Sequence, residues 1–293
     1  MDPDNIRLKE IKPVLTGYIN KARVILKRSA VPDEDAVHDI RVLMKKSRAV
    51  LRLAGPLIET ELNDKDFQSL RRVGQILSEW RDTSVHRKTL KELKKDLPRL
   101  FVILNNNEKI AALLKKPDAI TEPDEALRHD MDEIDDLLTK TVYRIRFNQM
   151  QKIDPVALMS QLELSYETVR NAYLECRNRT KPEKVHEFRK RSKDLLYQVC
   201  FFRPLNPSAV KSFEKRLERM TLNLGRYNDL YQLLKTLGYV YPDEAGSSSM
   251  DEFVIKIYEK QDRYLLKIWA DAYKCFCPGK ELINMLGFRL LVI

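Results

Sequence analysis

The feature of this sequence that most constrains its fold is an internal repeat with an offset of about 148 residues. Val37-His38-x-x-Arg41-x-x-x-Lys45 recurs as Val185-His186-x-x-Arg189-x-x-x-Lys193. Farther along, Leu77-Ser-Glu-Trp80-x-Asp82 is matched by Leu224-Gly-Arg-Tyr227-x-Asp229 at an offset of 147, and Tyr18 is matched by Tyr166 at 148. Three matches at nearly one offset indicate a tandem duplication. The chain is therefore expected to contain two similar structural units.

Each unit is expected to be helical. Apolar residues recur at helical spacing nearly throughout, with prolines and polar clusters at the breaks. Glycine is scarce, at 8 of 293 residues, which argues against the sandwiches, barrels and nucleotide-binding α/β folds that need it at turns. The predicted fold is all-α, with two pseudo-symmetric helical bundles and a shared basic cavity. Helices are expected over residues 5–29, 33–54, 62–80, 83–103, 124–149, 155–178, 183–202, 208–225, 227–238 and 250–274.

The domain organisation follows from the repeat. We expect a single domain over residues 1–293, with repeat 1 at about 5–150 and repeat 2 at about 153–275. A C-terminal tail, 276–293, is expected to dock onto the second unit. Thr180-x-x-Glu183 has the form of a capping box with Pro182 in the first turn. The stretch 246–249, Gly-Ser-Ser-Ser, is the clearest predicted loop.

The charge distribution points to an anionic partner. The chain has 53 Lys and Arg against 43 Asp and Glu, a net charge of +10. Residues 118–136 hold nine acids and one base, so the rest of the chain carries +18. A concentrated positive field favours nucleic acid, an anionic membrane surface or polyphosphate, without distinguishing among them.

The positive charge lies in stripes along predicted helices. At 100° per residue, the side chains of one stripe fall within about 80° of the helix circumference over roughly 21 Å: His38, Arg41, Lys45, Arg48 and Arg52. The second repeat has the same pattern in His186, Arg189, Lys190 and Lys193. Cations in a row repel one another, so such a stripe is a poor arrangement for stability alone. Arg pairs bidentately with phosphate oxygens and Lys adds point charge, so the stripes favour an extended polyanion.

At these two motifs the sequence resembles the CHAD family, the conserved-histidine α-helical domain. The segments Leu77–Asp82 and Leu224–Leu230 are similar to that family's second signature in each half. The resemblance covers roughly residues 10–275. It implies two helical bundles that enclose a basic cavity and bind inorganic polyphosphate without catalysis, in the cytoplasm and at polyphosphate granules.

The resemblance also implies a set of phosphate-contacting residues: His38, Arg41, Lys45, Arg48, His186, Arg189, Lys190 and Lys193. Two positions depart from the family pattern. Leu196 stands where a further basic residue is usual, and Ser78 stands where glycine is preferred. Both departures argue against equal binding by the two repeats. Lys215, Arg216 and Arg219 are expected to compensate in the second repeat.

Two alternative functions stay open from the sequence. RNA or single-stranded DNA would use the same surface, with bases stacking on aromatic side chains near the motifs: Tyr166, Tyr173, Tyr197, Tyr227 and Trp80. A metal-dependent phosphohydrolase would use the acidic cluster Asp130-x-Asp132-Glu133-x-Asp135-Asp136 to hold Mg²⁺. The cluster lacks the glycine of a calcium loop, and the other repeat has no equivalent, so a solvated helix start is preferred.

The remaining features favour a cytoplasmic protein without a cofactor. The acidic, polar N-terminus is unlike a secretion signal, and no apolar run reaches the length of a membrane span. The four cysteines form no disulfide framework, which suits a reducing compartment. Cys275-x-Cys277 has no second ligand pair, so no metal site is expected there.

Overall fold

The structure is a computed structural model of the chain. It describes residues 11–57, 60–80, 82–104, 107–115, 123–147, 155–239, 249–276 and 279–288. Within these ranges all regular secondary structure is helical and there is no strand, which confirms the predicted all-α class. No helix among the described residues is both long enough and apolar enough to cross a bilayer.

The helices follow one another with short connections. The first half contains α1 (Ile11–Leu26), α2 (Glu34–Ala54), the 3₁₀ turn η3 (Gly55–Leu57), α3 (Thr60–Glu79), α4 (Asp82–Asp96), α5 (Pro98–Leu104), α6 (Glu108–Leu114) and α7 (Glu125–Phe147). The second half contains α8 (Pro155–Asn178), α9 (Pro182–Val199), η4 (Cys200–Phe202), α10 (Pro207–Leu237), α11 (Ser249–Cys275) and α12 (Leu282–Met285).

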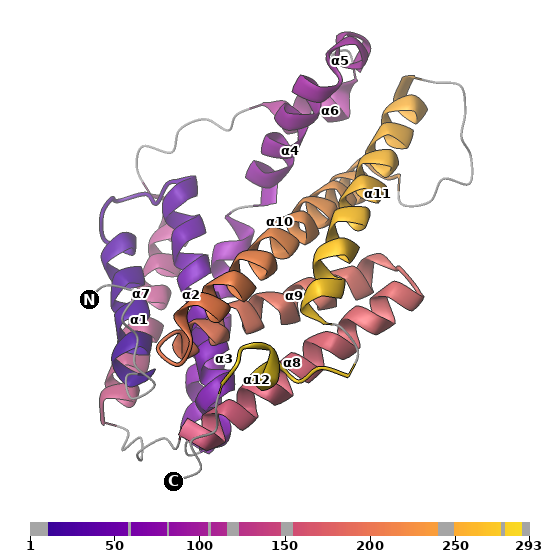
Figure 1. Cartoon of the computed structure of the whole chain (residues 1–293). Helices are drawn as coiled ribbons and strands as arrows, with labels where there is room; N and C mark the ends of the chain where they lie inside the picture. Colours follow the sequence, from indigo (N-terminus) through magenta and orange to yellow (C-terminus); the bar gives the residue numbers. More distant parts are fainter. Residues whose placement is uncertain are drawn as a thin grey trace.

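These helices form two packed groups (Figure 1). In the first, α1, α2, α3 and α7 pack on one another, and in the second α8 packs on α9, α9 on α10 and α10 on α11. Helices α2 and α9 are in contact and join the groups, whereas α4, α5 and α6 extend past them and lie beside α10 and α11. The periodic apolar residues supply the core; Ile40, Val73, Phe188 and Leu217 are fully buried.

Two expected helix boundaries differ in the structure. The segments 208–225 and 227–238 form one helix, α10, because Leu224, Tyr227 and Leu230 are all buried and keep the chain helical across the expected break. It ends at Gly238, whose φ of 88° is easily accessible only to glycine. The segment 83–103 is instead divided at Leu97 into α4 and α5, because Pro98 has no N–H to continue the helical hydrogen bonds.

The predicted capping box at Thr180 is wrong. The Thr180 hydroxyl donates to the carbonyl of Cys176 at 3.1 Å, so it belongs to the end of α8. The N-cap of α9 is Lys181, which makes no side-chain capping bond, and Pro182 begins the helix. The acids before α2 do cap it, since Asp33 accepts a hydrogen bond from the amide of Ala36 at 2.7 Å.

The C-terminal tail docks as expected over its described part. The amides of Leu282 and Ile283 donate to the carboxylate of Glu163 on α8, at 2.9 and 3.1 Å. The ring of Phe288 stacks on Phe202. Residues 289–293, 246–248 and Cys277 lie outside the described residues.

Candidate functional site

The cationic stripe of α2 meets α3 at a cavity of about 200 Å³. Residues such as Ile40 and Leu43 fix the orientation of α2 by burying its opposite face. The cavity is lined by Arg41, Lys45 and Arg48 from α2 and by Arg71, Gly74, Gln75 and Ser78 from α3. We call Arg41, Lys45, Arg48 and Arg71 the α2–α3 cluster. No carboxylate is among the lining residues, so the cavity is suited to an anion.

Arg41 is oriented by the opposite wall of this cavity. Its Nη1 donates to the carbonyl of Gly74 at 3.2 Å and to the hydroxyl of Ser78. The Ser78 hydroxyl in turn donates to the same carbonyl at 2.8 Å. Because neutral groups hold this guanidinium, its positive charge is positioned without being neutralised.

Arg48 is a second cation in the cluster, and its environment disfavours its charge. Burial lowers the pKa of Arg48, and the neighbouring charges of Arg52, Arg71 and Arg41 lower it further, against an opposing effect of Asp194. Its Nε is buried without a hydrogen-bond partner among the described residues. A bound anion would relieve both the repulsion and the missing hydrogen bond.

Arg52, the last member of the predicted stripe, has a structural contact instead. It forms an ion pair with Asp194 of α9 at 2.7 Å, and its guanidinium lies 4.7 Å from the ring centre of Phe67. The pair connects α2 to α9. Arg52 is absent from the lining of the cavity, and so is His38, which lies exposed near the start of α2.

The second predicted stripe lies on α9 and faces α10. The guanidinium of Arg189 lies against Gly225, where an added Cβ would be 3.6 Å from its Nε. His186 Nδ1 is 3.1 Å from Oδ1 of Asn228 on α10. Lys190 instead pairs with Glu187 at 3.3 Å on its own helix. The stripe therefore contacts the second signature segment, as Arg41 does in the first half.

Lys193 lies in a set of aromatic and cationic side chains. Its Nζ is 5.9 Å from the ring centre of Tyr197, and Lys46 of α2 lies at the same distance from that ring. Lys46 also lies 5.6 Å from the ring centre of Tyr18. Burial lowers the pKa of Lys193, Arg189 and Lys46 lower it further, and Glu218 opposes the effect. Tyrosine faces attract these ammonium groups electrostatically.

The cations of α10 are oriented toward α11 instead of α9. Arg219 binds both carboxylate oxygens of Asp271 on α11, with Nε to Oδ2 at 2.7 Å. Arg216 and Arg219 both lie near Cys275 at the end of α11, where burial raises the pKa of the thiol to about 12. Lys215 is exposed. Among the described residues, no hydrogen bond or ion pair joins these three cations to Arg189.

The aromatic side chains proposed as base-stacking platforms are mostly structural. Tyr166 and Tyr173 are buried, and Tyr227 is only 8% exposed. Tyr166 donates to the carbonyl of Cys275 at 3.0 Å, and Trp80 Nε1 donates to Asp130 at 3.1 Å. Tyr197 is half-buried beneath the two lysines. Tyr166 and Tyr173 have no face available for a base.

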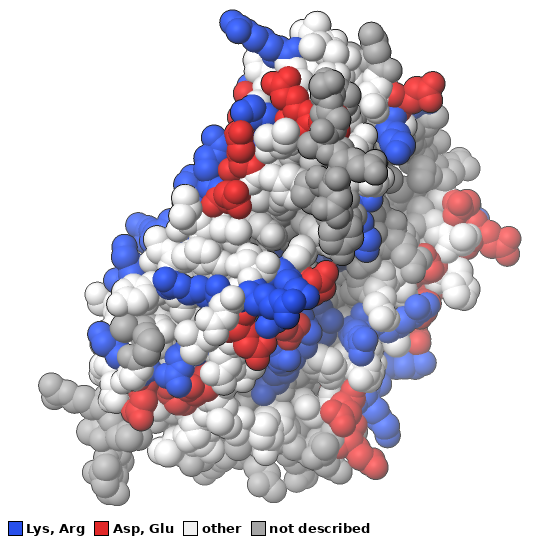
Figure 2. All heavy atoms as spheres, turned by 90° about the vertical axis from the view of Figure 1, so that its right-hand side faces the viewer, with Lys and Arg blue, Asp and Glu red and all other residues white. Residues whose placement is uncertain are grey.

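A larger cavity of about 600 Å³ lies between the end of α4 and α11. Four cations from α11 line it: Lys256, Lys260, Arg263 and Lys267. Lys260 pairs with Asp96 and Lys256 with Glu259 at 3.0 Å, so part of its positive charge is compensated locally. Figure 2, a view from the right-hand side of Figure 1, shows the same mixture, with Asp and Glu side chains beside groups of Lys and Arg.

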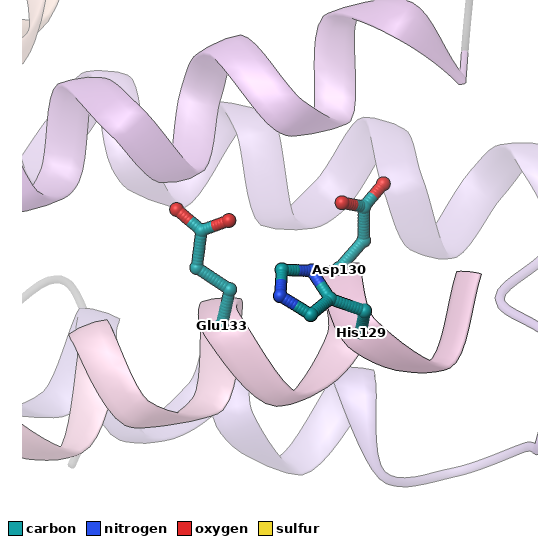
Figure 3. Close-up of side chains that lie close together, drawn as sticks. All are labelled: His129, Asp130 and Glu133. Carbon is teal, nitrogen blue, oxygen red and sulfur yellow. The ribbon is translucent and has the colours of Figure 1, made fainter. Parts of the chain in front are cut away.

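The acidic cluster of α7 contains the one potential metal-ligand group found among the described residues, namely His129, Asp130 and Glu133. Figure 3 shows the three side chains projecting from one side of α7 toward a neighbouring helix. The carboxylates already have partners there. Glu133 accepts two hydrogen bonds from Arg72 of α3, at 2.7 and 3.1 Å, and Asp130 accepts one from Trp80.

Asp135 extends this contact to α1, where it pairs with Arg23 at 3.0 Å and Lys27 at 2.8 Å. The carboxylates of Asp130, Glu133 and Asp135 therefore attach α7 to α1 and α3. None of them lines the α2–α3 cavity.

One member of the α2–α3 cluster, Arg71, was missed from the sequence. The signal was available, because Arg71, Gly74 and Ser78 are spaced by three and four residues and so share one face of a helix. Ser78 belongs to the second signature segment, and a cation one or two turns before it faces the same neighbour.

The fold and the cluster define the class of protein: an all-α protein in which two groups of helices present cationic side chains at helix–helix contacts. The chain belongs to the CHAD family, whose domain model matches residues 20–238. The resemblance inferred from the two histidine motifs is thereby confirmed.

The chain is also similar to the crystal structure of the CHAD domain from the plant Ricinus communis. The TM-score is 0.57 at 18% sequence identity, over 96% of this chain and 92% of that one, which supports the same fold. No curated protein matches the chain significantly.

Proposed function

We propose that this protein binds inorganic polyphosphate without catalysis, through cationic side chains on α2, α3 and α9. The α2–α3 cavity carries the proposal, because four cations line it and no carboxylate does. Phosphate oxygens would accept hydrogen bonds from the guanidinium groups, and a linear chain would pass from one cation to the next. A polyphosphate-related role at the level of the CHAD family is consistent with this function.

The proposal includes the finer architecture expected from the sequence. The chain would be one domain of two related halves, with the faces of α2 and α9 contributing to one basic binding region. The matched contacts of Arg41 with Ser78 and of Arg189 with Gly225 support this relation. The protein would act in the cytoplasm, at polyphosphate granules.

Binding of long-chain polyphosphate by the full chain tests the function. We expect affinity to fall steeply with salt, because counterions are released from a linear polyanion, with a slope of about −0.7 per phosphate contact in a log–log plot. Replacing Arg41→Glu together with Arg189→Glu should abolish binding at low salt. Circular dichroism would verify that the variant is folded.

The matched control makes the same change of charge elsewhere. Lys91 on α4 and Arg99 on α5 are both exposed, so Lys91→Glu with Arg99→Glu should fold and retain binding. If wild-type protein does not bind polyphosphate at low salt, or if the two double variants lose affinity equally, the proposal is wrong.

The same assay addresses RNA and hydrolysis. Polyphosphate should displace single-stranded RNA at equal phosphate concentration, with no base preference, since Tyr166 and Tyr173 are buried. Incubation with Mg²⁺ or Mn²⁺ should release no phosphate. Release that Asp132→Asn abolishes would instead establish a metal-dependent phosphohydrolase.

A further inference from the structure

The two halves of the chain are not equivalent at the proposed binding region. The repeat relates each member of the α2–α3 cluster to a residue of α9 or α10, at an offset of 148 in the first signature and 147 in the second. Arg41 corresponds to Arg189 and Lys45 to Lys193, but Arg48 corresponds to Leu196 and Arg71 to Glu218. We call Arg189, Lys193, Leu196 and Glu218 the α9–α10 set.

Contacts in the structure agree with this correspondence. Arg189 lies against Gly225 as Arg41 lies against Ser78. Glu218 lies close enough to Lys193 to oppose the lowering of its pKa, and Arg71 lies close enough to Arg48 to contribute to the lowering of its pKa. The α2–α3 cluster therefore carries four positive charges and no negative one, whereas the α9–α10 set has a net charge of +1.

Further contacts reduce the capacity of the second set to hold an anion. Lys193 is drawn to the face of Tyr197 and shares it with Lys46. Leu196, which replaces the arginine, is 8% exposed and packs in the core. Arg219, the nearest candidate for a compensating cation, is bound to Asp271.

We infer that the α2–α3 cavity is the principal phosphate seat of this chain, that Arg71 is one of its ligands, and that Glu218 weakens phosphate binding at the corresponding α9–α10 surface. This inference rests on the proposed function and adds an order of binding to it. A short polyphosphate occupies the α2–α3 cavity alone, and a longer chain extends from there over α9. Pyrophosphate and tripolyphosphate, with a few negative charges each, match the four cations of the seat.

Isothermal titration of the full-length protein with tripolyphosphate at low salt tests the inference. One tripolyphosphate per chain is expected. Arg71→Gln should weaken its binding about tenfold, the effect of losing one charge-assisted hydrogen bond. The adjacent Arg72→Gln is the matched control: Arg72 binds Glu133 on α7, so its loss should change the affinity less than about threefold.

A second matched pair compares the two halves directly. Lys45 and Lys193 occupy corresponding positions, and Lys45→Gln should weaken tripolyphosphate binding while Lys193→Gln leaves it nearly unchanged. In the opposite direction, Glu218→Gln should tighten the binding of long-chain polyphosphate severalfold. The control Glu252→Gln neutralises an exposed acid on α11 and should have no such effect.

Building the missing cations gives the strictest test. Leu196→Arg with Glu218→Arg should create a second tripolyphosphate site per chain. Because Leu196 is buried, this variant can fail to fold, in which case the single variants decide the matter. Two equal sites in wild-type protein, or equal losses for Lys45→Gln and Lys193→Gln, would overturn the inference. Long-chain polyphosphate binding by wild-type protein would meanwhile uphold the proposed function.

Discussion

Arg48 and Leu196 occupy corresponding positions in the two halves, and each is largely enclosed by neighbouring helices. A leucine side chain gains stability from burial. A guanidinium group loses hydration there, and in this protein it also meets the charges of Arg52, Arg71 and Arg41. At the scale of single residues, the first half therefore holds an arrangement of charges that favours ligand binding over stability.

This conflict predicts the effect of Arg48→Leu. We expect the free energy of unfolding of the ligand-free protein to rise by about 1 kcal/mol, because a buried charge without full compensation is replaced by an apolar side chain of similar length. Tripolyphosphate binding should weaken about tenfold or more. Thermal melts with and without tripolyphosphate measure both effects.

Arg99→Leu serves as the control for that variant. Arg99 is exposed on α5, and the change should alter stability by less than about 0.5 kcal/mol. A fall in the stability of Arg48→Leu, larger than the change in the control, would show that the guanidinium is stabilising where it lies.

At the scale of helices, α7 is attached to the first group by charge as well as by apolar packing. Ile134, Leu138 and Ile145 are buried against α1 and α3. Beside them, Glu133 pairs with Arg72 and Asp135 with Arg23 and Lys27. Hydrogen bonding from Arg72 lowers the pKa of Glu133, and hydrogen bonds from Lys27 and Arg23 lower the pKa of Asp135 although burial opposes them.

These shifts predict how the attachment of α7 depends on pH. A carboxylate whose pKa is lowered by folding contributes stability that is present above its unfolded pKa, near 4.5 for Glu and 3.8 for Asp, and that is lost as pH falls through its folded pKa. Glu133→Gln with Asp135→Asn should lower the free energy of unfolding by about 1 kcal/mol at pH 7, since the pairs are partly exposed. Denaturant unfolding at several pH values measures this difference.

The difference between wild-type and variant protein should shrink as pH falls below about 4.5, because the wild-type carboxylates then become protonated as well. Asp132→Asn with Asp136→Asn, at exposed positions of the same helix, is the control. A difference that is unchanged between pH 7 and pH 3 would mean that the substitutions act through packing instead of charge.

At the scale of the whole molecule, two features hold the helices together. The pair Arg52–Asp194 and a hydrogen bond from Gln198 to the carbonyl of Ala49, at 3.0 Å, connect α2 with α9. The second group also depends on α11, which lies beyond the span matched by the family model. Phe253, Ile257 and Ile268 of α11 are fully buried.

Removal of α11 should therefore prevent native folding. Each fully buried apolar side chain contributes about 1.5–3 kcal/mol, and total stabilities are typically about 5–15 kcal/mol. A chain that ends at residue 239 is expected to show no cooperative thermal transition, as followed by circular dichroism. Addition of a fragment of residues 249–293 should restore a transition if packing is the cause. A truncated chain that melts cooperatively near the full-length temperature would contradict this account.

The sequence by itself determined the features that depend on local spacing. Helical periodicity and scarce glycine predicted an all-α protein, and the two histidine motifs identified the family and the stripe that lines the α2–α3 cavity. Prolines and caps located most helix ends. The join at Tyr227 was missed because burial outweighs a local break, and the capping box failed because Thr180 found a closer acceptor in α8.

Only the tertiary structure decided which of the aligned cations face an open cavity and which face a carboxylate. Arg41, Arg52 and Arg219 are alike in sequence, yet Arg41 lies against neutral groups while Arg52 and Arg219 are bound to Asp194 and Asp271. Those partners are 142 and 52 residues away along the chain. Spacing fixes the face of a helix on which a side chain lies, but its partner depends on which helix packs against that face. The net charge of +10 thus became a particular set of four side chains only once α2 was packed on α3.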